Sequence, residues 1–246
     1  MSGGKRVALI TGANKGIGLE TARQLGKLGI TVILGSRDLA KGEAAAARLR
    51  AEGIDARPLH LDVTNAADRD AAVKFFNEHF GKLDILINNA GIAEANAWSG
   101  NNTSAVPPET VQRVFETNLF APVALTQELL PLLRKSPAAR IVNLSSIMGS
   151  LTLHSDPKSP IYNKKPMAYD ASKSALNAFT IHLAHELRDT RIKVNSAHPG
   201  WVKTDMGTDA APMDVVAGAT TSVALATLSD DGPTGAFLHM GKPLPW

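Results

Sequence analysis

Short, almost uniformly apolar runs alternate with longer amphipathic segments along the whole chain, and this alternation restricts the fold more than any other feature. Strands that are apolar at nearly every position are typical of a sheet buried on both faces. The predicted strands occupy 6–11, 31–36, 55–63, 83–91, 139–146, 191–200 and 235–240. Strand–helix alternation of this kind predicts a parallel sheet covered by helices on both sides.

Helical patterns fill most of the intervals between these runs. Gly29 can end the first predicted helix. Asp38 can cap the start of the second helix, and Gly53 can end it. The predicted helices cover 17–29, 38–53, 65–81, 109–133, 167–188 and 214–228, with loops at 93–108 and 150–166. We expect a single α/β domain over residues 1–246. It is a doubly wound Rossmann domain with seven parallel strands in the order 3-2-1-4-5-6-7 and a ligand crevice beyond their C-terminal ends.

The composition excludes several classes of function. The chain has 246 residues, a net charge of +3 and no cysteine, which rules out disulfides, thiolate metal sites and cysteine nucleophiles. His182 and His185 lie three residues apart, but no metal-ligand set accompanies them, so we expect no metal. Basic residues are spread out rather than clustered, which predicts no nucleic-acid partner. The chain shows no secretion signal and no membrane-spanning stretch, so a cytoplasmic protein is expected.

A glycine-rich segment, "TGANKGIG", joins the first predicted strand to the first helix. Backbone N–H groups at such a helix start, together with the helix dipole, favour a phosphate group. The glycine spacing is G-x-x-x-G-x-G, which differs from the commoner dinucleotide fingerprint. The alternative is a turn with purely structural glycines. The candidate cofactor-binding residues here are Gly12, Asn14, Lys15, Gly16, Ile17 and Gly18.

The end of the second predicted strand bears on the choice between NADP(H) and NAD. An acidic residue there would bind the ribose 2′-hydroxyl of NAD, whereas an arginine would bind the 2′-phosphate of NADP. Ser36 stands where the acid is expected and Arg37 follows it; Lys15 adds a second positive charge. Asp38 is the counter-argument, although capping the helix is its simpler role. We therefore predict NADP(H).

The segment "YDASK" places Tyr169 and Lys173 four residues apart on a predicted helix, where the two side chains share one face. An ammonium group beside a phenol favours the phenolate and is expected to lower the tyrosine pKa. That would suit a proton donor working near neutral pH. The alternative is a surface lysine packed along a tyrosine ring. Tyr162, the other tyrosine, has Pro166 four positions on and cannot form this pair.

Together these motifs resemble the short-chain dehydrogenase/reductase family. The resemblance rests on "TGANKGIG", "NNAG" at 88–91, "SS" at 145–146, "YDASK" at 169–173 and "PGWVKTDM" at 199–206, in that order across nearly the whole chain. Within the family, the sequence looks most like the NADPH-dependent carbonyl reductases. The resemblance implies the reduction of aldehydes and ketones to alcohols by hydride transfer from NADPH to a small, mostly apolar carbonyl substrate.

The resemblance also implies a catalytic set. Tyr169 would be the general acid, and Lys173 would bind the nicotinamide ribose and lower the tyrosine pKa. Ser146 would hydrogen-bond the substrate oxygen, and Asn118 would hold a water in a proton relay. Pro122 lies four residues after Asn118 and lacks the N–H that would bond the Asn118 carbonyl in a regular helix, which leaves that carbonyl free for the relay. A tolerated kink is the alternative reading of Pro122.

Further positions carry over from the resemblance. Plain turn chemistry is the alternative for each of them, and for Asn88 a structural and a cofactor role are equally open. The remaining implied cofactor-binding residues are Asp62, Val63, Asn89, Ala90, Gly91, Pro199, Gly200, Val202 and Thr204. The expected substrate-pocket residues, for which an ordinary core position is the alternative, are Ile92, Trp98, Ile147, Met148, Trp201 and Met206.

The segment between Ser146 and Tyr169 is longer than the family usually has. The surplus could cap the pocket through Tyr162, or cover a helix face that serves subunit contact in relatives. The sequence therefore leaves open a homodimer, a homotetramer and a monomer. Alternative functions are reduction of another carbonyl class, such as a 3-oxoacyl thioester, oxidation of a steroid-like alcohol, and a non-catalytic NADP-binding regulator.

Overall fold

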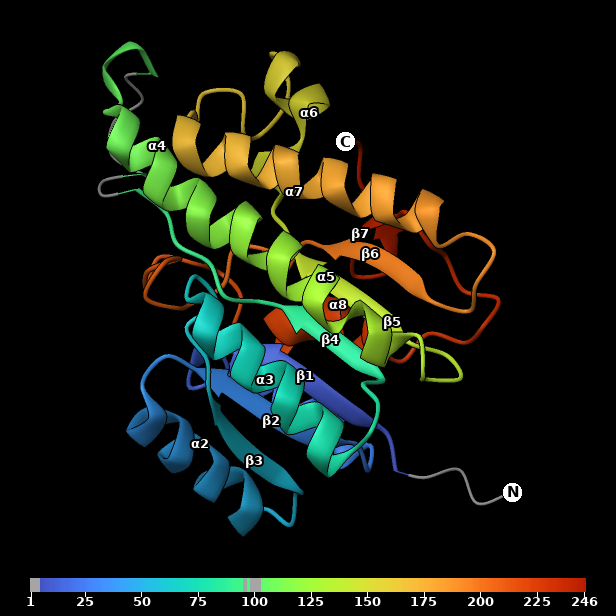
Figure 1. The fold of residues 1–246 in the computed structure, drawn as a ribbon. Coiled ribbons are helices and arrows are strands. Elements are labelled where there is room, and N and C mark those ends of the chain that lie inside the picture. Colours follow the sequence, from blue (N-terminus) through green and yellow to red (C-terminus); the bar gives the residue numbers. More distant parts are fainter. Residues whose placement is uncertain (1–4, 95–96, 98–102) are drawn as a thin grey trace.

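An eight-stranded sheet forms the centre of the molecule, with the strand order β3-β2-β1-β4-β5-β6-β7-β8 (Figure 1). The structure, a computed structural model, describes residues 5–94, 97 and 103–246. The strands are β1 (Val7–Thr11), β2 (Thr31–Ser36), β3 (Ala56–His60), β4 (Ile85–Asn88), β5 (Arg140–Leu144), β6 (Lys193–Ala197), β7 (Phe237–His239) and β8 (Lys242–Pro243). The first seven are parallel, so the predicted fold class and strand order are confirmed.

Strand β8 is a feature that the sequence analysis did not predict. It pairs antiparallel with β7 through the register Leu238↔Pro243 and His239↔Lys242. The two residues between these pairs, Met240 and Gly241, both have positive φ angles (48° and 76°), as tight hairpin turns require. Two residues of strand, both exposed, carry too little apolar pattern to be read from sequence.

Helices cover both faces of the sheet (Figure 1). They are α1 (Gly16–Lys27), α2 (Leu39–Ala51), α3 (Ala66–His79), α4 (Pro108–Phe115), α5 (Ala121–Leu133), α6 (Leu151–Ser155), α7 (Met167–Glu186) and α8 (Val215–Ala226). Within the described residues, no helix combines the length and the apolar character that crossing a bilayer needs.

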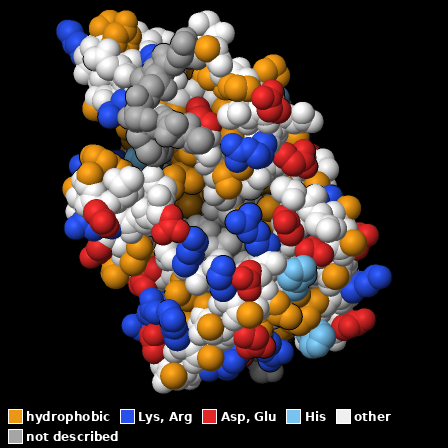
Figure 2. All heavy atoms as spheres, turned by 90° about the vertical axis from the view of Figure 1, so that its left-hand side faces the viewer, with side chains coloured by type: hydrophobic (Ala, Val, Ile, Leu, Met, Phe, Trp, Pro, Cys, Tyr) orange, Lys and Arg blue, Asp and Glu red, His pale blue; other side chains and the backbone are white. Residues whose placement is uncertain are grey.

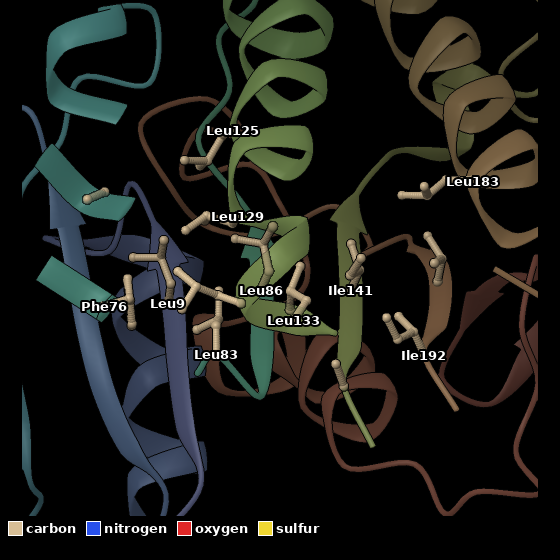
Figure 3. Close-up of a cluster of buried hydrophobic side chains, with 14 of the residues drawn as sticks. Leu9, Phe76, Leu83, Leu86, Leu125, Leu129, Leu133, Ile141, Leu183 and Ile192 are labelled. Atoms are coloured by element: carbon tan, nitrogen blue, oxygen red, sulfur yellow. The ribbon is translucent and has the colours of Figure 1, made fainter. Parts of the chain in front are cut away.

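Each face of the sheet has its own hydrophobic core. On one face, Leu9 of β1 belongs to a cluster of buried side chains that extends across the sheet and includes Phe76 of α3, Leu129 of α5 and Leu183 of α7 (Figure 3). On the other face, the next residue, Ile10, packs with residues of α1, α2 and α8. Successive residues of a strand point to opposite faces, so both must be apolar. This explains why the strands read as continuous apolar runs.

A buried row of polar side chains crosses the sheet and binds α7 to it. Asn88 Nδ2 donates to Asn143 Oδ1 over 2.8 Å, and Asn143 Nδ2 donates to Thr180 Oγ1 over 2.9 Å. Ser196 Oγ donates to the same Thr180 oxygen over 2.9 Å. These side chains are 0–3% exposed, so each hydrogen bond replaces water that the core excludes. The row connects β4, β5 and β6 to α7 and so fixes the position of α7 along the strands.

The helix predicted over 109–133 is interrupted. Between α4 and α5 lies a π-helical turn, η2 (Glu116–Phe120), which Ala121 closes by donating its N–H to the carbonyl of Glu116. Pro122 follows at the start of α5, where a missing N–H is tolerated most easily in a widened turn.

The predicted loop at 150–166 contains a short helix, α6, which corrects that part of the prediction. Ser150 caps it by accepting a hydrogen bond from the N–H of Leu153 over 3.1 Å. The segment is tied to the rest of the molecule by Thr152, whose N–H donates to the carbonyl of Trp246 over 3.0 Å, and by His154, which contacts Asp170 of α7 over 3.1 Å. The segment is therefore packed against α7 and the C-terminus.

The core arrangement predicts a large loss of stability when Leu129 is replaced by alanine. Leu129 is completely buried between α5 and the sheet, so truncation removes apolar contacts and leaves a cavity. We expect Leu129→Ala to lower the free energy of unfolding by about 2–5 kcal/mol, measured by urea denaturation. Leu151→Ala is the matched control, because Leu151 is 66% exposed and its truncation should change little. Equal losses in the two variants would contradict this assignment of the core.

Candidate active site

A cavity of about 1270 Å³ opens at the C-terminal ends of the strands. Figure 2 faces this side of the molecule and shows a central hollow with Lys and Arg side chains around it. Five cationic residues line the cavity: Lys15, Arg37, Lys41, Lys173 and Lys203. Four acidic residues line it as well, and two of them form ion pairs with these lysines, Asp205 with Lys15 and Asp38 with Lys41. The crevice lies where a doubly wound sheet is expected to place it.

The glycine-rich turn forms one wall of this cavity. Gly12 and Gly16 have φ angles of 62° and 57°, which glycine adopts without strain. At Gly18 a Cβ atom would lie 2.5 Å from Asn89 Nδ2 and 2.7 Å from the Gly12 carbonyl oxygen, so only glycine fits. The first turn of α1 holds no acidic residue. A phosphate can therefore approach the backbone closely there, and the residues present fit a dinucleotide.

Asn89 holds the glycine-rich turn against β4. Its Nδ2 donates to the Thr11 carbonyl over 2.7 Å, and Thr11 Oγ1 accepts hydrogen bonds from the N–H groups of Asn89 and Ala90, each over 2.9 Å. Both Asn89 and Ala90 line the cavity. Asn88, in contrast, points into the buried polar row between β4 and β5. Its contacts favour the structural alternative.

The segment after β2 presents two cations, Arg37 and Lys41, and one acid, Asp38, which also lines the cavity. Asp38 is the N-cap of α2: its Oδ1 accepts a hydrogen bond from the N–H of Lys41 over 3.0 Å, and Oδ2 pairs with Lys41 Nζ over 3.1 Å. Ser36 Oγ donates to the Asp38 carbonyl over 2.8 Å. Arg37 makes none of these contacts and lines the cavity. Lys41 was missed in the sequence analysis, although its place one turn after Arg37 was a usable signal.

The predicted catalytic side chains Ser146, Tyr169 and Lys173 come together beside the inner end of the cavity, although Ser146 itself is not a lining residue. The hydroxyl groups of Ser146 and Tyr169 share a hydrogen bond. Lys173 Nζ lies 5.6 Å from the centre of the Tyr169 ring and donates to the Leu144 carbonyl over 2.8 Å. All three side chains are less than 9% exposed. The neighbouring Ser145, together with Tyr169 and Lys173, lines the cavity.

Burial shifts the pKa values of the tyrosine and the lysine in opposite directions. Loss of hydration raises the pKa of Tyr169 to about 12, against a lowering from the Ser146 hydrogen bond and with a further increase from the charges of Asp170 and Glu94. Burial also lowers the pKa of Lys173 to about 8. The predicted lowering of the tyrosine pKa is thus wrong for the cofactor-free protein, because desolvation is the largest influence on that pKa and Lys173 is not among the groups that lower it.

Asn118 is fully buried in the π turn and lies behind the cavity wall. Its Oδ1 accepts from the N–H of Ile92 over 2.9 Å, and its Nδ2 donates to the Ile92 carbonyl over 2.8 Å and to Ser172 Oγ over 3.0 Å. Ser172 Oγ in turn donates to the Tyr169 carbonyl over 2.7 Å. The Asn118 side chain thus connects the loop after β4 to the helix that carries Tyr169. Its relay role stays a prediction.

Of the remaining predicted cofactor residues, five line the cavity and two do not. Asp62, Val63, Gly91, Pro199 and Thr204 line the cavity with the residues named above.

Gly200 and Val202 are not among the lining residues. A Cβ atom at Gly200 would lie 2.3 Å from Met213 Sδ, and its φ angle is 92°. Val202 is 3% exposed and packs against Gly218 of α8. Their contacts favour turn chemistry, which is the alternative to a cofactor role at these two positions.

The expected substrate pocket is only partly assembled. Ile92 and Met206 line the cavity. Ile147 and Met148 instead pack around Tyr169 with Ile161 from the long segment before it.

Two tryptophans were also expected in that pocket. Trp201 is 54% exposed and its Nε1 donates to the Gly207 carbonyl over 2.7 Å, so it is not a pocket wall. Trp98 lies outside the described residues. Tyr162, which the sequence analysis offered as a cap of the pocket, is 37% exposed and does not line the cavity. The centre of its ring lies 5.0 Å from Lys165 Nζ.

The sequence analysis also missed Glu94, which lines the cavity beside Ala93. Its Oε2 accepts a hydrogen bond from the backbone N–H of Tyr169 over 3.0 Å. Nothing in the local sequence points to this contact, because the two residues are 75 positions apart. In the part of the chain that the structure describes, no group of three His, Cys, Asp or Glu side chains could hold a metal ion.

This combination of fold and site is that of the short-chain dehydrogenase/reductase family, to which the chain belongs: the family model described as short chain dehydrogenase matches residues 6–214. The protein is therefore an oxidoreductase that acts on CH–OH groups or carbonyls, related to carbonyl reductases and plant terpenoid reductases.

Individual relatives match over almost their whole length. The chain is 36% identical to (-)-isopiperitenone reductase of Mentha piperita, with 98% of each chain covered. It is 33% identical to carbonyl reductase [NADPH] 1 of Homo sapiens, with 100% of each covered. Among solved structures, an NADPH-bound carbonyl reductase from chicken fatty liver superposes with a TM-score of 0.84 at 31% identity, covering 98% of this chain and 99% of that one.

The environment of Asp170 predicts a pH-dependent effect on stability. Burial and the charge of Glu94 raise the pKa of Asp170 from 3.8 to about 8. The native protein therefore retains a proton that the unfolded chain releases, and this stabilisation is lost as the pH rises from about 4 to about 8. Because asparagine cannot ionise, Asp170→Asn should become more stable relative to the parent as the pH rises.

The measurement is the difference in melting temperature between Asp170→Asn and the parent, from about pH 5 to about pH 9. Asp70→Asn, at an exposed position of α3, serves as the control and should show a constant difference. A flat difference for Asp170→Asn would contradict the raised pKa.

Proposed function

We propose that this protein reduces aldehydes and ketones to alcohols with NADPH, and oxidises secondary alcohols in reverse. The observation that carries this proposal is the meeting of Ser146, Tyr169 and Lys173 beside the inner end of a cavity. The glycine-rich turn, with Arg37 and Lys41 beside it, forms the other end of the same cavity. A dinucleotide laid along the cavity would have its phosphates at the glycine-rich turn and its reactive ring near the tyrosine.

The side chains can perform the protein's share of this reaction. Bound NADPH would supply a hydride to the carbonyl carbon. Ser146 and Tyr169 would donate hydrogen bonds to the carbonyl oxygen, on which negative charge develops. Tyr169 would then transfer its phenolic proton to that oxygen, which completes the alcohol. Lys173, whose Nζ lies near the ring, would bind the ribose and stabilise the phenolate left behind.

Two cationic side chains near the end of β2, Arg37 and Lys41, favour NADP(H) over NAD. Arg37 and Lys41 line the cavity where a 2′-phosphate would lie, and Asp38 is engaged in capping α2. An arginine can pair with a phosphate through two parallel hydrogen bonds. The carbonyl reductases among the relatives carry NADPH in their names, which supports the same choice.

The proposed substrate is a small carbonyl compound that is largely apolar. Ile92, Ala93 and Met206 line the cavity near the catalytic side chains. A panel of aldehydes, ketones, cyclic enones, a 3-oxoacyl thioester and a ketosteroid, each with NADPH and with NADH, tests the proposal through the absorbance of the reduced nicotinamide. Consumption of NADPH with apolar carbonyls is expected. Binding of NADPH without turnover of any compound would favour a regulator instead.

Replacing Tyr169 by phenylalanine should abolish most activity and leave cofactor binding intact. The variant keeps the buried ring and loses only the proton donor, whose removal typically costs about 10²–10⁴-fold in rate. We expect kcat to fall by that factor, with the NADPH dissociation constant unchanged within about threefold, as measured by fluorescence titration. Tyr162→Phe is the control and should retain the parent rate. Near-parental turnover by Tyr169→Phe would refute the acid role.

Replacing Arg37 by aspartate should shift the cofactor preference from NADPH to NADH. The new carboxylate repels a 2′-phosphate and can accept a hydrogen bond from a 2′-hydroxyl. We expect KM for NADPH to rise at least about tenfold and KM for NADH to fall. Arg48→Asp makes the same charge change at an exposed position of α2 and should alter neither constant. An unchanged NADPH preference in Arg37→Asp would show that Arg37 does not bind the phosphate.

A further inference from the structure

Helix α7, which carries Tyr169 and Lys173, lacks a cap from its own N-terminal sequence. It begins after Pro166, whose side chain makes no capping hydrogen bond. The first bond within the helix runs from the N–H of Asp170 to the Pro166 carbonyl, over 2.9 Å. The N–H of Tyr169 therefore belongs to the first turn, whose donors have no partner inside the helix.

Glu94 supplies the missing acceptor from a distant part of the chain. Its Oε2 lies 3.0 Å from the backbone nitrogen of Tyr169. A carboxylate at a helix N-terminus is favoured both by the unpaired N–H groups and by the helix dipole. Glu94 is half-buried, lines the cavity, and is fixed in turn by the hydrogen bond from the Ala97 N–H to its own carbonyl over 3.2 Å. It therefore holds the backbone of the catalytic tyrosine itself.

Several titratable groups lie near Tyr169. Glu94 approaches from the loop after β4, and Asp170 and Lys173 belong to α7. Behind Asp170 lie two basic groups of the long segment, His154 at 3.1 Å and Lys165, whose Nζ donates to the His154 carbonyl over 2.8 Å. Burial lowers the pKa of His154, so this ring is neutral near pH 7.

We propose that Glu94 is a positioning residue for the reduction reaction: its carboxylate accepts the hydrogen bond of the Tyr169 N–H and so fixes the first turn of α7 at the catalytic tyrosine. The negative charge of the same carboxylate disfavours the phenolate. This inference rests on the proposed function of Tyr169 as the acid. The direction of the charge effect agrees with the increase in the pKa of Tyr169, to which burial contributes most and the charges of Asp170 and Glu94 add. A protonated phenol serves carbonyl reduction, whereas alcohol oxidation needs the phenolate.

Two substitutions separate the hydrogen bond from the charge. Glu94→Gln keeps an oxygen acceptor for the Tyr169 N–H and removes the charge, whereas Glu94→Ala removes both. We expect Glu94→Gln to retain kcat near neutral pH within about threefold and to move the alkaline limb of the reduction profile to lower pH by roughly 0.5–1 unit. Glu94→Ala should show the same shift and lose about tenfold in kcat, because the tyrosine is no longer held.

A second measurement follows Tyr169 directly in the cofactor-free protein. The chain has two tyrosines, so in a Tyr162→Phe background the near-ultraviolet absorbance of tyrosinate reports on Tyr169 alone. At the highest pH where circular dichroism shows an intact fold, the Glu94→Gln variant should contain more tyrosinate than its background. Glu78→Gln, on the exposed side of α3, is the matched control and should change neither readout.

The outcomes distinguish this inference from the proposed function. If both Glu94 variants lower only the melting temperature and leave the pH profile and the tyrosinate content unchanged, Glu94 is a structural residue and the inference is wrong. If the parent reduces no carbonyl compound but Glu94→Gln still increases tyrosinate, the proposed function fails while the charge effect on Tyr169 stands.

Discussion

The close approach of α7 to the end of β5 is the constraint on which the catalytic arrangement depends. Just after β5, a Cβ atom at Gly149 would lie only 2.8 Å from the backbone carbon of Lys173, so only glycine allows this approach. Lys173 can then reach back to the Leu144 carbonyl with its ammonium group. One helical turn earlier, Tyr169 meets Ser146. A helix packed at an ordinary distance would leave all of these side chains apart.

The position of α7 along the sheet is fixed separately, by hydrogen bonds in its buried middle. Thr180 accepts hydrogen bonds from Asn143 of β5 and Ser196 of β6, at positions from which water is excluded. A shift of the helix by one residue would leave these polar groups unpaired, at a cost of about 1–3 kcal/mol for each. Apolar packing alone tolerates small shifts, but this polar row does not. Glu94 holds the first turn of α7 in addition. The helix is therefore fixed by hydrogen bonds both at its first turn and in its middle.

The two ends of the cavity differ in electrostatic character, and each suits its part of the reaction. At the outer end, exposed cations such as Arg37 meet solvent and can attract an anionic cofactor. At the inner end, burial suppresses charge: it raises the pKa of Tyr169 and lowers that of Lys173. A neutral phenol beside a readily discharged amine costs little to bury, and the positive charge of an oxidised nicotinamide would favour the phenolate only after hydride transfer.

The sequence by itself determined the parallel sheet, because apolar alternation and glycine spacing are local patterns, and its resemblance to the family predicted the strand order and a candidate catalytic set around the Tyr169–Lys173 pair. It did not reveal Glu94, whose partner is 75 positions away, or the structural packing of Gly200 beneath Met213. It also gave the wrong direction for the tyrosine pKa, since local charge was visible and burial was not. Contacts between distant segments, and the exclusion of water that they bring, were decided only by the tertiary structure.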